Sequence, residues 1–231
     1  MDKLYLLESN KNKEMMSDDE AIIMLPDIYC QTDYSKHTLE KFAESFGRPA
    51  FMLDYFYLIN KEANNISQDD GEKARRLMTN FNANDFIEFF RNILTEIKQS
   101  YPNIKNFIVI GFCFGGRLAY IAGAEQSVSK VVSFYGGGAN TANYVSNKTP
   151  IEYLADKRKD SDLKIISFFG TKDESIPETD RTEIKQALTK ANINYTSYEY
   201  EAPHAYFQEG RKNYDLVASR VSWEVLSQVL N

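Results

Sequence analysis

Apolar, strand-like runs recur along this chain, and amphipathic or polar segments separate them. The six clearest runs are Ala21–Leu25, Phe51–Tyr55, Asn106–Ile110, Lys130–Phe134, Leu163–Phe169 and Asn194–Tyr200. Strands that are buried on both faces are apolar throughout, so short apolar runs alternating with helices are typical of a mostly parallel sheet covered on both sides. Leu4–Glu8 is expected to add an edge strand that pairs with the next strand. The pattern therefore predicts an α/β fold with helices on both faces of a central sheet.

The clearest helical pattern runs from Asn84 to Ser100, with Asn84 or Asp85 as the expected cap and Pro102 beyond its end. Its apolar side chains share one face: Phe86, Phe89, Phe90, Ile93, Leu94 and Ile97. We expect this stripe to be core rather than a ligand site. A last helix, from about Tyr214 to Leu230, is expected to pack Val217, Val221 and the segment from Trp223 onward against the sheet.

Two polar stretches, Asn60–Lys73 and Gly136–Lys159, interrupt the alternation. Both follow the carboxyl ends of strands, where ligands of open α/β sheets bind, so they are either rims or lids of a site or ordinary surface loops. No internal repeat divides the sequence. A chain of 231 residues suits one α/β domain, so residues 1–231 are expected to form a single domain.

One glycine-rich segment carries candidate chemistry: Gly111-Phe112-Cys113-Phe114-Gly115-Gly116-Arg117. It follows a strand-like run and opens a helix-like segment, as a nucleophile elbow does, and glycine lets neighbouring backbone pass close to the turn. At a helix N-terminus Cys113 would also be favoured as thiolate. The alternative is a buried cysteine in a glycine-rich turn. A phosphate-binding loop is disfavoured, because the required lysine and hydroxyl are missing.

A nucleophilic cysteine needs a base, and the base needs a group that orients it. The chain has only two histidines, and His204 follows the strand-like run Asn194–Tyr200. Asp173 follows the run Leu163–Phe169. Taken alone, Asp173 could be a turn residue, and His204 could be either a turn residue or a base. The order of nucleophile, acid and histidine, each after a predicted strand, is that of α/β-hydrolases and favours catalysis.

The sequence resembles the dienelactone hydrolases, cysteine-dependent members of the α/β-hydrolase fold. The resembling segments are Met24–Tyr29, Asp54–Phe56, Gly111–Gly116, Ser133–Gly136, Gly170–Asp173, Ile176–Pro177 and Pro203–Tyr206. The resemblance implies that Cys113 is the nucleophile, His204 the base and Asp173 the orienter. It also implies an oxyanion hole formed by the backbone N–H groups of Ile28 and Phe114. The implied activity is hydrolysis of small esters or lactones, without a cofactor.

The sequence departs from this family where a substrate carboxylate would be held. Asp27 stands where the family carries glutamate, and Gln208 stands where an arginine four residues beyond the histidine is expected. Arg211 is one helical turn later and could replace that arginine. A second family arginine corresponds to Arg75 or Arg76, unless both are solvated charges. Because Gln208 is neutral, we expect a preference for neutral esters or lactones over anionic ones.

Aromatic residues lie close to the marked positions: Tyr29, Phe112, Phe114, Tyr206 and Phe207. Aromatic side chains at such positions are either core or the lining of an apolar substrate pocket. Tyr29 and Tyr206 are therefore candidates for substrate contact, together with Asp27, Gln208 and the arginines.

The composition excludes several other functions. The net charge of −6 is unfavourable for binding nucleic acid. Two cysteines suit a reducing compartment, and the short apolar run at the start and the lack of a long apolar stretch predict a cytoplasmic protein without a membrane span. Cys30 is expected to be a buried apolar residue, although it lies near the predicted oxyanion loop. Two histidines without clustered carboxylates are too few for a catalytic zinc, and no dinucleotide-binding glycine pattern is present. The remaining alternative to an enzyme is a catalytically silent binding or assembly module.

Overall fold

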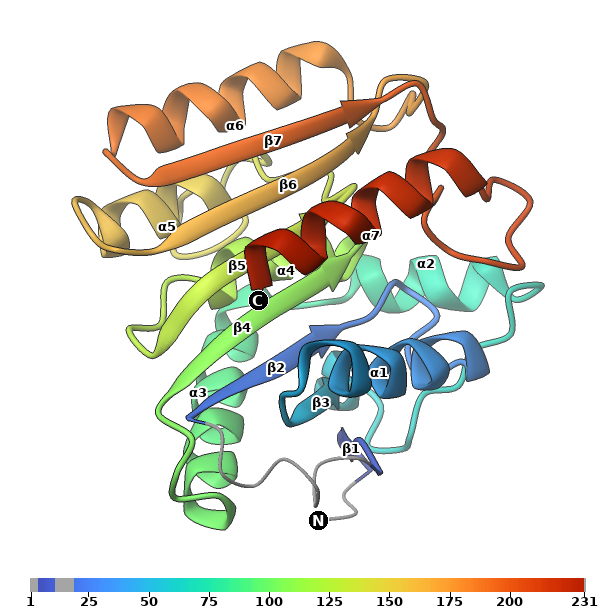
Figure 1. The fold of residues 1–231 in the computed structure, drawn as a ribbon, viewed down its shortest axis with the longest axis vertical. Helices are drawn as coiled ribbons and strands as arrows, with labels where there is room; N and C mark the ends of the chain where they lie inside the picture. The colour runs from blue at the N-terminus through green and yellow to red at the C-terminus, as the bar shows by residue number, and fades with distance from the viewer. Residues whose placement is uncertain (1–3, 11–18, 231) are drawn as a thin grey trace.

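The computed structural model describes residues 4–10 and 19–230, and within these ranges seven strands form one sheet in the order β1-β3-β2-β4-β5-β6-β7 (Figure 1). The strands are β1 (Leu6–Glu8), β2 (Glu20–Leu25), β3 (Ala50–Leu53), β4 (Asn106–Phe112), β5 (Val128–Phe134), β6 (Lys164–Gly170) and β7 (Asn194–Tyr200). All six clear runs of the sequence are strands. The predicted α/β fold with a mostly parallel sheet is confirmed.

The first strand lies at one edge of the sheet, but its partner differs from the expected one. β1 pairs antiparallel with β3, with Leu6 opposite Leu53, whereas the next strand in the chain, β2, pairs with β3 and β4. All other neighbouring strands are parallel. The expectation that this edge strand pairs with the next was wrong, because β3 lies between them in the sheet.

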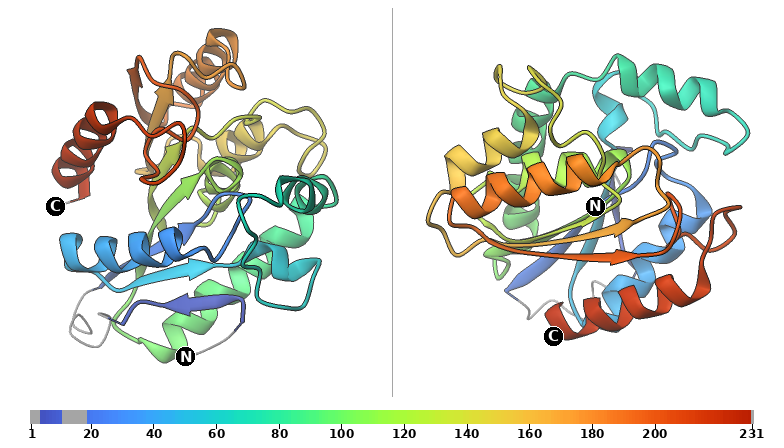
Figure 2. Two further views of the ribbon diagram at one scale, coloured as in Figure 1. Left: turned by 90° about the vertical axis from the view of Figure 1, so that its right-hand side faces the viewer. Right: turned by 90° about the horizontal axis from the view of Figure 1, so that it is seen from above.

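Helices cover both faces of the sheet, as predicted. The views in Figure 2 place α1 and α7 on one face and α3, α4, α5 and α6 on the other. The helices are α1 (Asp33–Phe46), α2 (Gly71–Thr79), α3 (Ala83–Ser100), α4 (Phe114–Ala122), α5 (Pro150–Arg158), α6 (Glu178–Lys190) and α7 (Leu216–Leu230). Because both faces are covered, the central strands are buried along nearly their whole length.

The two predicted helices exist, with corrections at their ends and faces. Helix α3 is capped by Asn82, whose side chain accepts from the N–H of Asn84, rather than by Asn84 or Asp85. Helix α7 begins at Leu216, and its Val217 and Val221 are 72% and 37% exposed, so they do not pack on the sheet as expected. Its buried face consists instead of Ala218, Ser219, Ser222, Leu226 and Leu230. Small residues near its N-terminus let that end lie close to the underlying loop.

Both polar stretches contain the beginning of a helix as well as a loop. Helix α2 begins at Gly71, inside the first polar stretch. Helix α5 lies wholly inside the second polar stretch, at its C-terminal end. Thr149 and Glu152 form a capping box around Pro150 at the start of α5. The run expected at Phe51–Tyr55 also ends early, because the chain turns into a 3₁₀ helix at Tyr55–Leu58.

The parallel strands bring distant parts of the chain to one edge of the sheet. β4, β6 and β7 are followed by the segments that carry Cys113, Asp173 and His204, and Figure 1 shows that their arrowheads end on the same side. Since β5 separates β4 from β6, and β7 follows β6, these segments can meet only through their loops. Among the residues described, no helix is both long and apolar enough to cross a membrane.

Candidate active site

Cys113 lies on a sharp turn between β4 and α4. Its backbone has φ 55° and ψ −115°, a conformation that L-residues rarely adopt and that is typical of strained functional positions. A Cβ added to Gly111 would lie 2.1 Å from the carbonyl oxygen of Gly115, and one added to Gly115 would lie 2.2 Å from that of Leu25. Glycine is thus required on both sides of the cysteine by close backbone approach. The side chain of Cys113 is only half-buried.

His204 joins the cysteine to an acid. Its Nε2 lies 3.1 Å from Sγ of Cys113, and its Nδ1 lies 2.6 Å from Oδ2 of Asp173. The carboxylate of Asp173 is fully buried, and its other oxygen accepts from the N–H of Ser175 at 2.9 Å. Neither Glu174 nor any other acid replaces it beside this imidazole in the part of the chain that the structure describes. The three residues that the sequence singled out therefore form one continuous chain of contacts.

The surroundings of His204 favour its protonated form. Burial by itself lowers the pKa of His204. Hydrogen bonds to Asp173 and to Cys113, together with the charges of these two groups, raise the pKa by more than burial lowers it, to about 10. An imidazolium at this position places a positive charge next to the sulfur of Cys113. Such a neighbour favours a reactive thiolate in general.

The backbone N–H groups of Ile28 and Phe114 are among those near the cysteine that have no hydrogen-bond acceptor in the described residues. Phe114 is the first residue of α4, so its N–H is one of those that a helix leaves without an internal partner. Ile28 follows β2 in the loop whose carbonyl oxygens at Leu25 and Pro26 lie against Gly115. These are the two donors that the resemblance implied for an oxyanion hole.

Asp27 is the centre of a buried polar cluster in the same loop. Its Oδ1 accepts from the N–H of Tyr29 at 2.9 Å, and its Oδ2 accepts from Nε2 of Gln208 at 2.8 Å. Arg211 donates to the same Oδ2 and forms an ion pair with it. The guanidinium of Arg211 also lies 4.4 Å from the ring centroid of Tyr29. An arginine thus stands beside Gln208, and Asp27 neutralises its charge.

The other arginine candidates lie on α2. Arg75 and Arg76 are both exposed. A terminal nitrogen of Arg75 and the hydroxyl of Tyr29 both lie 3.6 Å from the point where a Cβ on Gly71 would be, so Arg75 extends toward Tyr29. Arg76 makes no side-chain hydrogen bond or ion pair with the residues described. The structure therefore brings Arg75, but not Arg76, toward the Asp27 cluster.

Most of the aromatic candidates are core residues. Phe112 stacks on Phe134, with ring centroids 5.0 Å apart, and Phe207 packs on Phe134 at 4.5 Å. Tyr206 is fully buried, and its hydroxyl lies 2.9 Å from Oγ of Ser222 on α7. Phe114 is also buried. Only Tyr29 remains half-exposed at the cluster.

The sequence analysis gave no role to Tyr135, which the structure places next to the histidine. Its ring centroid lies 5.1 Å from that of His204, its φ is 40°, and its fully buried hydroxyl has no partner among the described residues. Burial and the nearby groups Tyr34, Tyr206, Asp27 and Cys113 raise its pKa well above the usual value. The sequence feature that could have identified Tyr135 is its position directly after β5 and before Gly136, at the same edge of the sheet as the other site residues.

Cys30 is fully buried, as expected, and lies close to the oxyanion loop. Burial raises its pKa, and the charges of Asp54 and Asp27 raise it further. Asp54 is itself fully buried and accepts from the backbone and side-chain N–H groups of Asn64. Cys30 is therefore a poorer candidate nucleophile than the half-buried Cys113, which lies beside the imidazole of His204.

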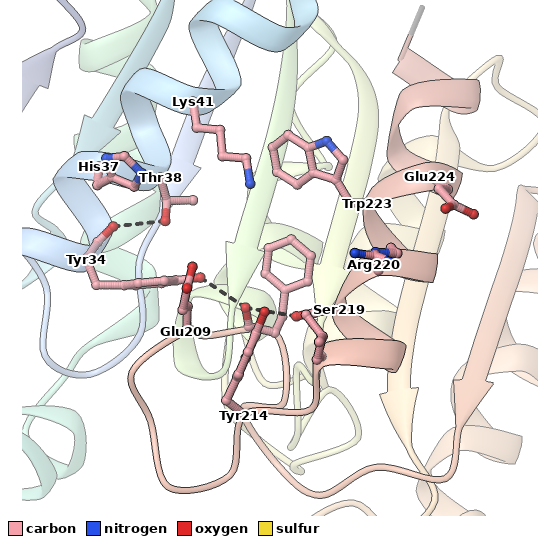
Figure 3. A pocket seen from close by; sticks show the side chains of 12 residues that line it. Tyr34, His37, Thr38, Lys41, Glu209, Tyr214, Ser219, Arg220, Trp223 and Glu224 are labelled. Atoms are coloured by element: carbon pink, nitrogen blue, oxygen red, sulfur yellow. Dashed lines mark hydrogen bonds between the residues drawn. The ribbon is translucent and has the colours of Figure 1, made fainter.

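A separate cavity of about 400 Å³ lies between α1 and α7 (Figure 3). It is lined by Tyr34, His37, Thr38, Lys41, Phe207, Glu209, Tyr214, Leu216, Ser219, Arg220, Trp223 and Glu224. Nζ of Lys41 lies 4.2 Å from the ring centroid of Trp223. None of Cys113, Asp173 and His204 lines this cavity, so it is not the space in which the cysteine would react.

Nowhere in the described ranges do three His, Cys, Asp or Glu side chains gather as metal ligands would.

Comparison with known proteins relates nearly the whole chain to one family. A family model described as "Dienelactone hydrolase family" matches residues 6–231. A relative from Synechocystis named "Putative carboxymethylenebutenolidase" is 36% identical over 134 residues, which are 57% of this chain and 53% of the relative. A relative of the same name from Escherichia coli is 27% identical over 124 residues, which are 53% of this chain and 44% of that protein. The alignments thus span about half the length of these curated relatives.

Solved structures share the fold at low sequence identity. The crystal structure of a "Putative Dienelactone Hydrolase" from Klebsiella pneumoniae superposes with a TM-score of 0.78 at 20% identity and covers 92% of this chain and 86% of that one. At this identity the likeness concerns the fold alone. The match over nearly the whole sequence, on a mostly parallel sheet with this strand order, shows that the chain belongs to the dienelactone hydrolase family.

Proposed function

We propose that this chain is a cysteine-dependent hydrolase of small esters or lactones, with Cys113 as nucleophile, His204 as acid and base, and Asp173 as orienter. The observation that carries the proposal is the line of contacts from Sγ through the imidazole to a buried carboxylate, at 3.1 and 2.6 Å. Family membership supports the reaction class. A triad is recognised by this geometry and by the roles that it permits.

The acylation step follows from the positions of these atoms. The thiolate of Cys113 attacks the carbonyl carbon, a C–S bond forms, and the π electron pair moves to the oxygen. The N–H groups of Ile28 and Phe114, which have no acceptor among the described residues, are available to hold this oxyanion. When the intermediate collapses, the C–O bond breaks and the leaving oxygen takes the proton from the imidazolium of His204.

Deacylation needs the opposite function from the same histidine. Once the sulfur carries an acyl group, it has no charge, and one of the causes that raise the pKa of His204 is removed. The neutral imidazole can then take a proton from water as the water oxygen bonds to the thioester carbon. When this second intermediate collapses, the C–S bond breaks, the acid leaves, and the sulfur of Cys113 keeps the electron pair as thiolate beside the imidazolium. Asp173 holds the ring at Nδ1 throughout, so Nε2 faces the reacting atoms in both steps.

The Asp27 cluster supports a preference for neutral substrates. Arg211 and Gln208 both donate to Oδ2 of Asp27, so the charge of Arg211 is already paired. An anionic substrate would have to displace a buried carboxylate before Arg211 could bind it, which costs free energy that a neutral ester does not spend. The substrate class proposed is therefore neutral, apolar esters or lactones.

Selective alkylation tests the proposal. We expect the protein to hydrolyse p-nitrophenyl acetate, and one equivalent of iodoacetamide to abolish turnover while mass spectrometry finds the label on Cys113. Cys30 is an internal control, because it is fully buried and its pKa is raised. Loss of activity with the label on Cys30 alone would contradict the assignment. A protein labelled at Cys113 that never turned over an ester would instead be a binding module.

A further inference from the structure

Tyr55 connects the two backbone segments that carry the proposed oxyanion donors. Its side chain is fully buried, and its single hydroxyl hydrogen is shared between two carbonyl oxygens, those of Pro26 at 2.8 Å and Asp27 at 2.7 Å. We propose that Tyr55 is a positioning residue that sets the direction of the Ile28 N–H in the oxyanion hole. This inference rests on the proposed function, because it concerns a donor of that hole.

The geometry of the peptide bond links the hydroxyl to the donor. The carbonyl of Asp27 and the N–H of Ile28 belong to one planar trans peptide, so they point in opposite directions. Holding the Asp27 carbonyl toward Tyr55 therefore turns the Ile28 N–H away from Tyr55. The N–H of Cys30 donates to the same carbonyl at 3.0 Å and closes a turn over this peptide. The peptide is thus held from two sides.

A flipped peptide would work against the reaction. It would present the Asp27 carbonyl oxygen, instead of an N–H, to the developing negative charge, and two negative oxygens repel each other. The side chain of Asp27 is paired with Arg211 in the cluster described above. The Tyr55 hydroxyl keeps the backbone of this residue fixed, whatever its carboxylate contacts.

The ring of Tyr55 supports the second donor. It packs edge-on against Phe114, with ring centroids 5.6 Å apart, and against Phe56 at 4.8 Å and Phe81 at 5.8 Å. Phe114 carries the other proposed donor, whose N–H has no acceptor among the described residues. One buried side chain therefore contacts both halves of the proposed hole, through its hydroxyl on one side and its ring on the other.

Removing only the hydroxyl tests this role. We expect Tyr55→Phe to lower kcat on p-nitrophenyl acetate about tenfold with KM changed less than about twofold, since weakening a donor is milder than losing one, which costs about 10²- to 10³-fold. Alkylation of Cys113 by iodoacetamide is a displacement at carbon that forms no oxyanion. Its rate in the same variant should stay within about twofold of wild type.

Tyr120→Phe is the matched control, because Tyr120 on α4 is also fully buried and its hydroxyl bonds to Oγ of Ser167 on β6 at 2.7 Å. It should lower the thermal midpoint as Tyr55→Phe does and leave kcat unchanged. An unchanged kcat in Tyr55→Phe, or equal losses in hydrolysis and alkylation, would overturn the proposal. A wild type that iodoacetamide fails to inactivate would count against the proposed function instead.

A conservative analogue separates the hydroxyl from the ring. 3-Fluorotyrosine at position 55 retains the hydroxyl donor and the aromatic packing. The protein that carries this analogue should therefore hydrolyse the ester at the wild-type rate. This measurement also serves if Tyr55→Phe folds too poorly to assay. A loss of kcat in the fluorinated protein as large as that expected for the phenylalanine variant would show that ring packing, and not the hydrogen bond, is responsible.

Discussion

At the scale of single residues, His204 lies between the carboxylate of Asp173 and the sulfur of Cys113, and each contact has a separate proposed function. Nδ1 binds a buried carboxylate that has no other charged partner among the described residues, whereas Nε2 faces a half-buried sulfur. In the proposed mechanism the first contact fixes the orientation of the ring, and the second takes part in the reaction. In this proposal the contact with Cys113 is productive only while the contact with Asp173 holds the ring in place.

This dependence predicts non-additive losses. We expect His204→Ala and Asp173→Asn each to lower kcat by about 10³-fold or more, and the double variant to lose little beyond the worse single one, as residues acting as a unit do. Steady-state kinetics of the four proteins gives the comparison, and circular dichroism verifies their folding. Losses that multiply would show that the two residues act independently.

The ion pair between Asp27 and Arg211 allows a prediction about specificity. Asp27→Asn should keep the bond from the Tyr29 N–H, release the charge of Arg211 and raise kcat/KM for an anionic ester relative to its neutral analogue by about tenfold, since a hydrogen bond to a charged group contributes about 1.5–3 kcal/mol. Competition kinetics at low salt measures the ratio.

Adding Arg211→Gln to this variant provides its control, and the preference should then return to neutral esters. If wild type already favoured the anionic ester by tenfold, the paired guanidinium would be available after all, or Arg75 would be the binding group.

At the scale of elements, the elbow depends on how closely α4 approaches the end of β2. Gly115 lies where a Cβ would be 2.2 Å from the carbonyl oxygens of both Leu25 and Pro26. Backbone at this distance cannot yield as a flexible side chain can. The contact therefore sets the distance between the cysteine turn and the loop that carries Ile28.

Gly115→Ala should separate these two elements. We expect it to lower the free energy of unfolding by about 2 kcal/mol or more, in the range of an overpacked core, and to reduce esterase activity. Gly71→Ala is the control, because its nearest neighbours are side-chain atoms at 3.6 Å, an ordinary contact, and alanine suits a helix better than glycine does. Urea denaturation of both variants gives the comparison. Equal stability of the two would contradict the close approach.

At the scale of the whole molecule, the histidine couples stability to pH. Its folded-state pKa of about 10 is above the unfolded value of about 6.5, so the protonated form stabilises the fold. This contribution is fully present below about pH 6.5 and is lost as the pH rises through about 10. The free energy of unfolding should thus fall across this interval in wild type.

His204→Gln should remove that part of the decline, because glutamine does not titrate. Urea denaturation at several pH values between 6 and 10 measures the difference between the two proteins. If their unfolding free energies fell in parallel, other groups would account for the alkaline loss, and the histidine would not be protonated as the geometry indicates.

Local patterns in the sequence determined much of the fold and the main candidates for chemistry. All six runs are strands, and the buried ones are continuously apolar because both faces of the sheet are covered there, whereas β7, at the edge, is only partly buried. Cys113, Asp173 and His204 were identified because each follows such a strand, and parallel strands end at one edge. Helix α5 was missed, although the capping box of Thr149 and Glu152 was readable.

Other features depended on contacts between residues far apart in the chain. The partner of β1, the exposed face of α7 and the pairing of Arg211 with Asp27, 184 positions away, have no local signal. The same holds for Tyr55, which looks like a strand residue in the sequence but bonds the loop of Asp27. Periodicity records which side of an element is buried. Only the tertiary structure decides what that side is buried against, because packing and hydrogen bonds join atoms that are close in space and distant in sequence.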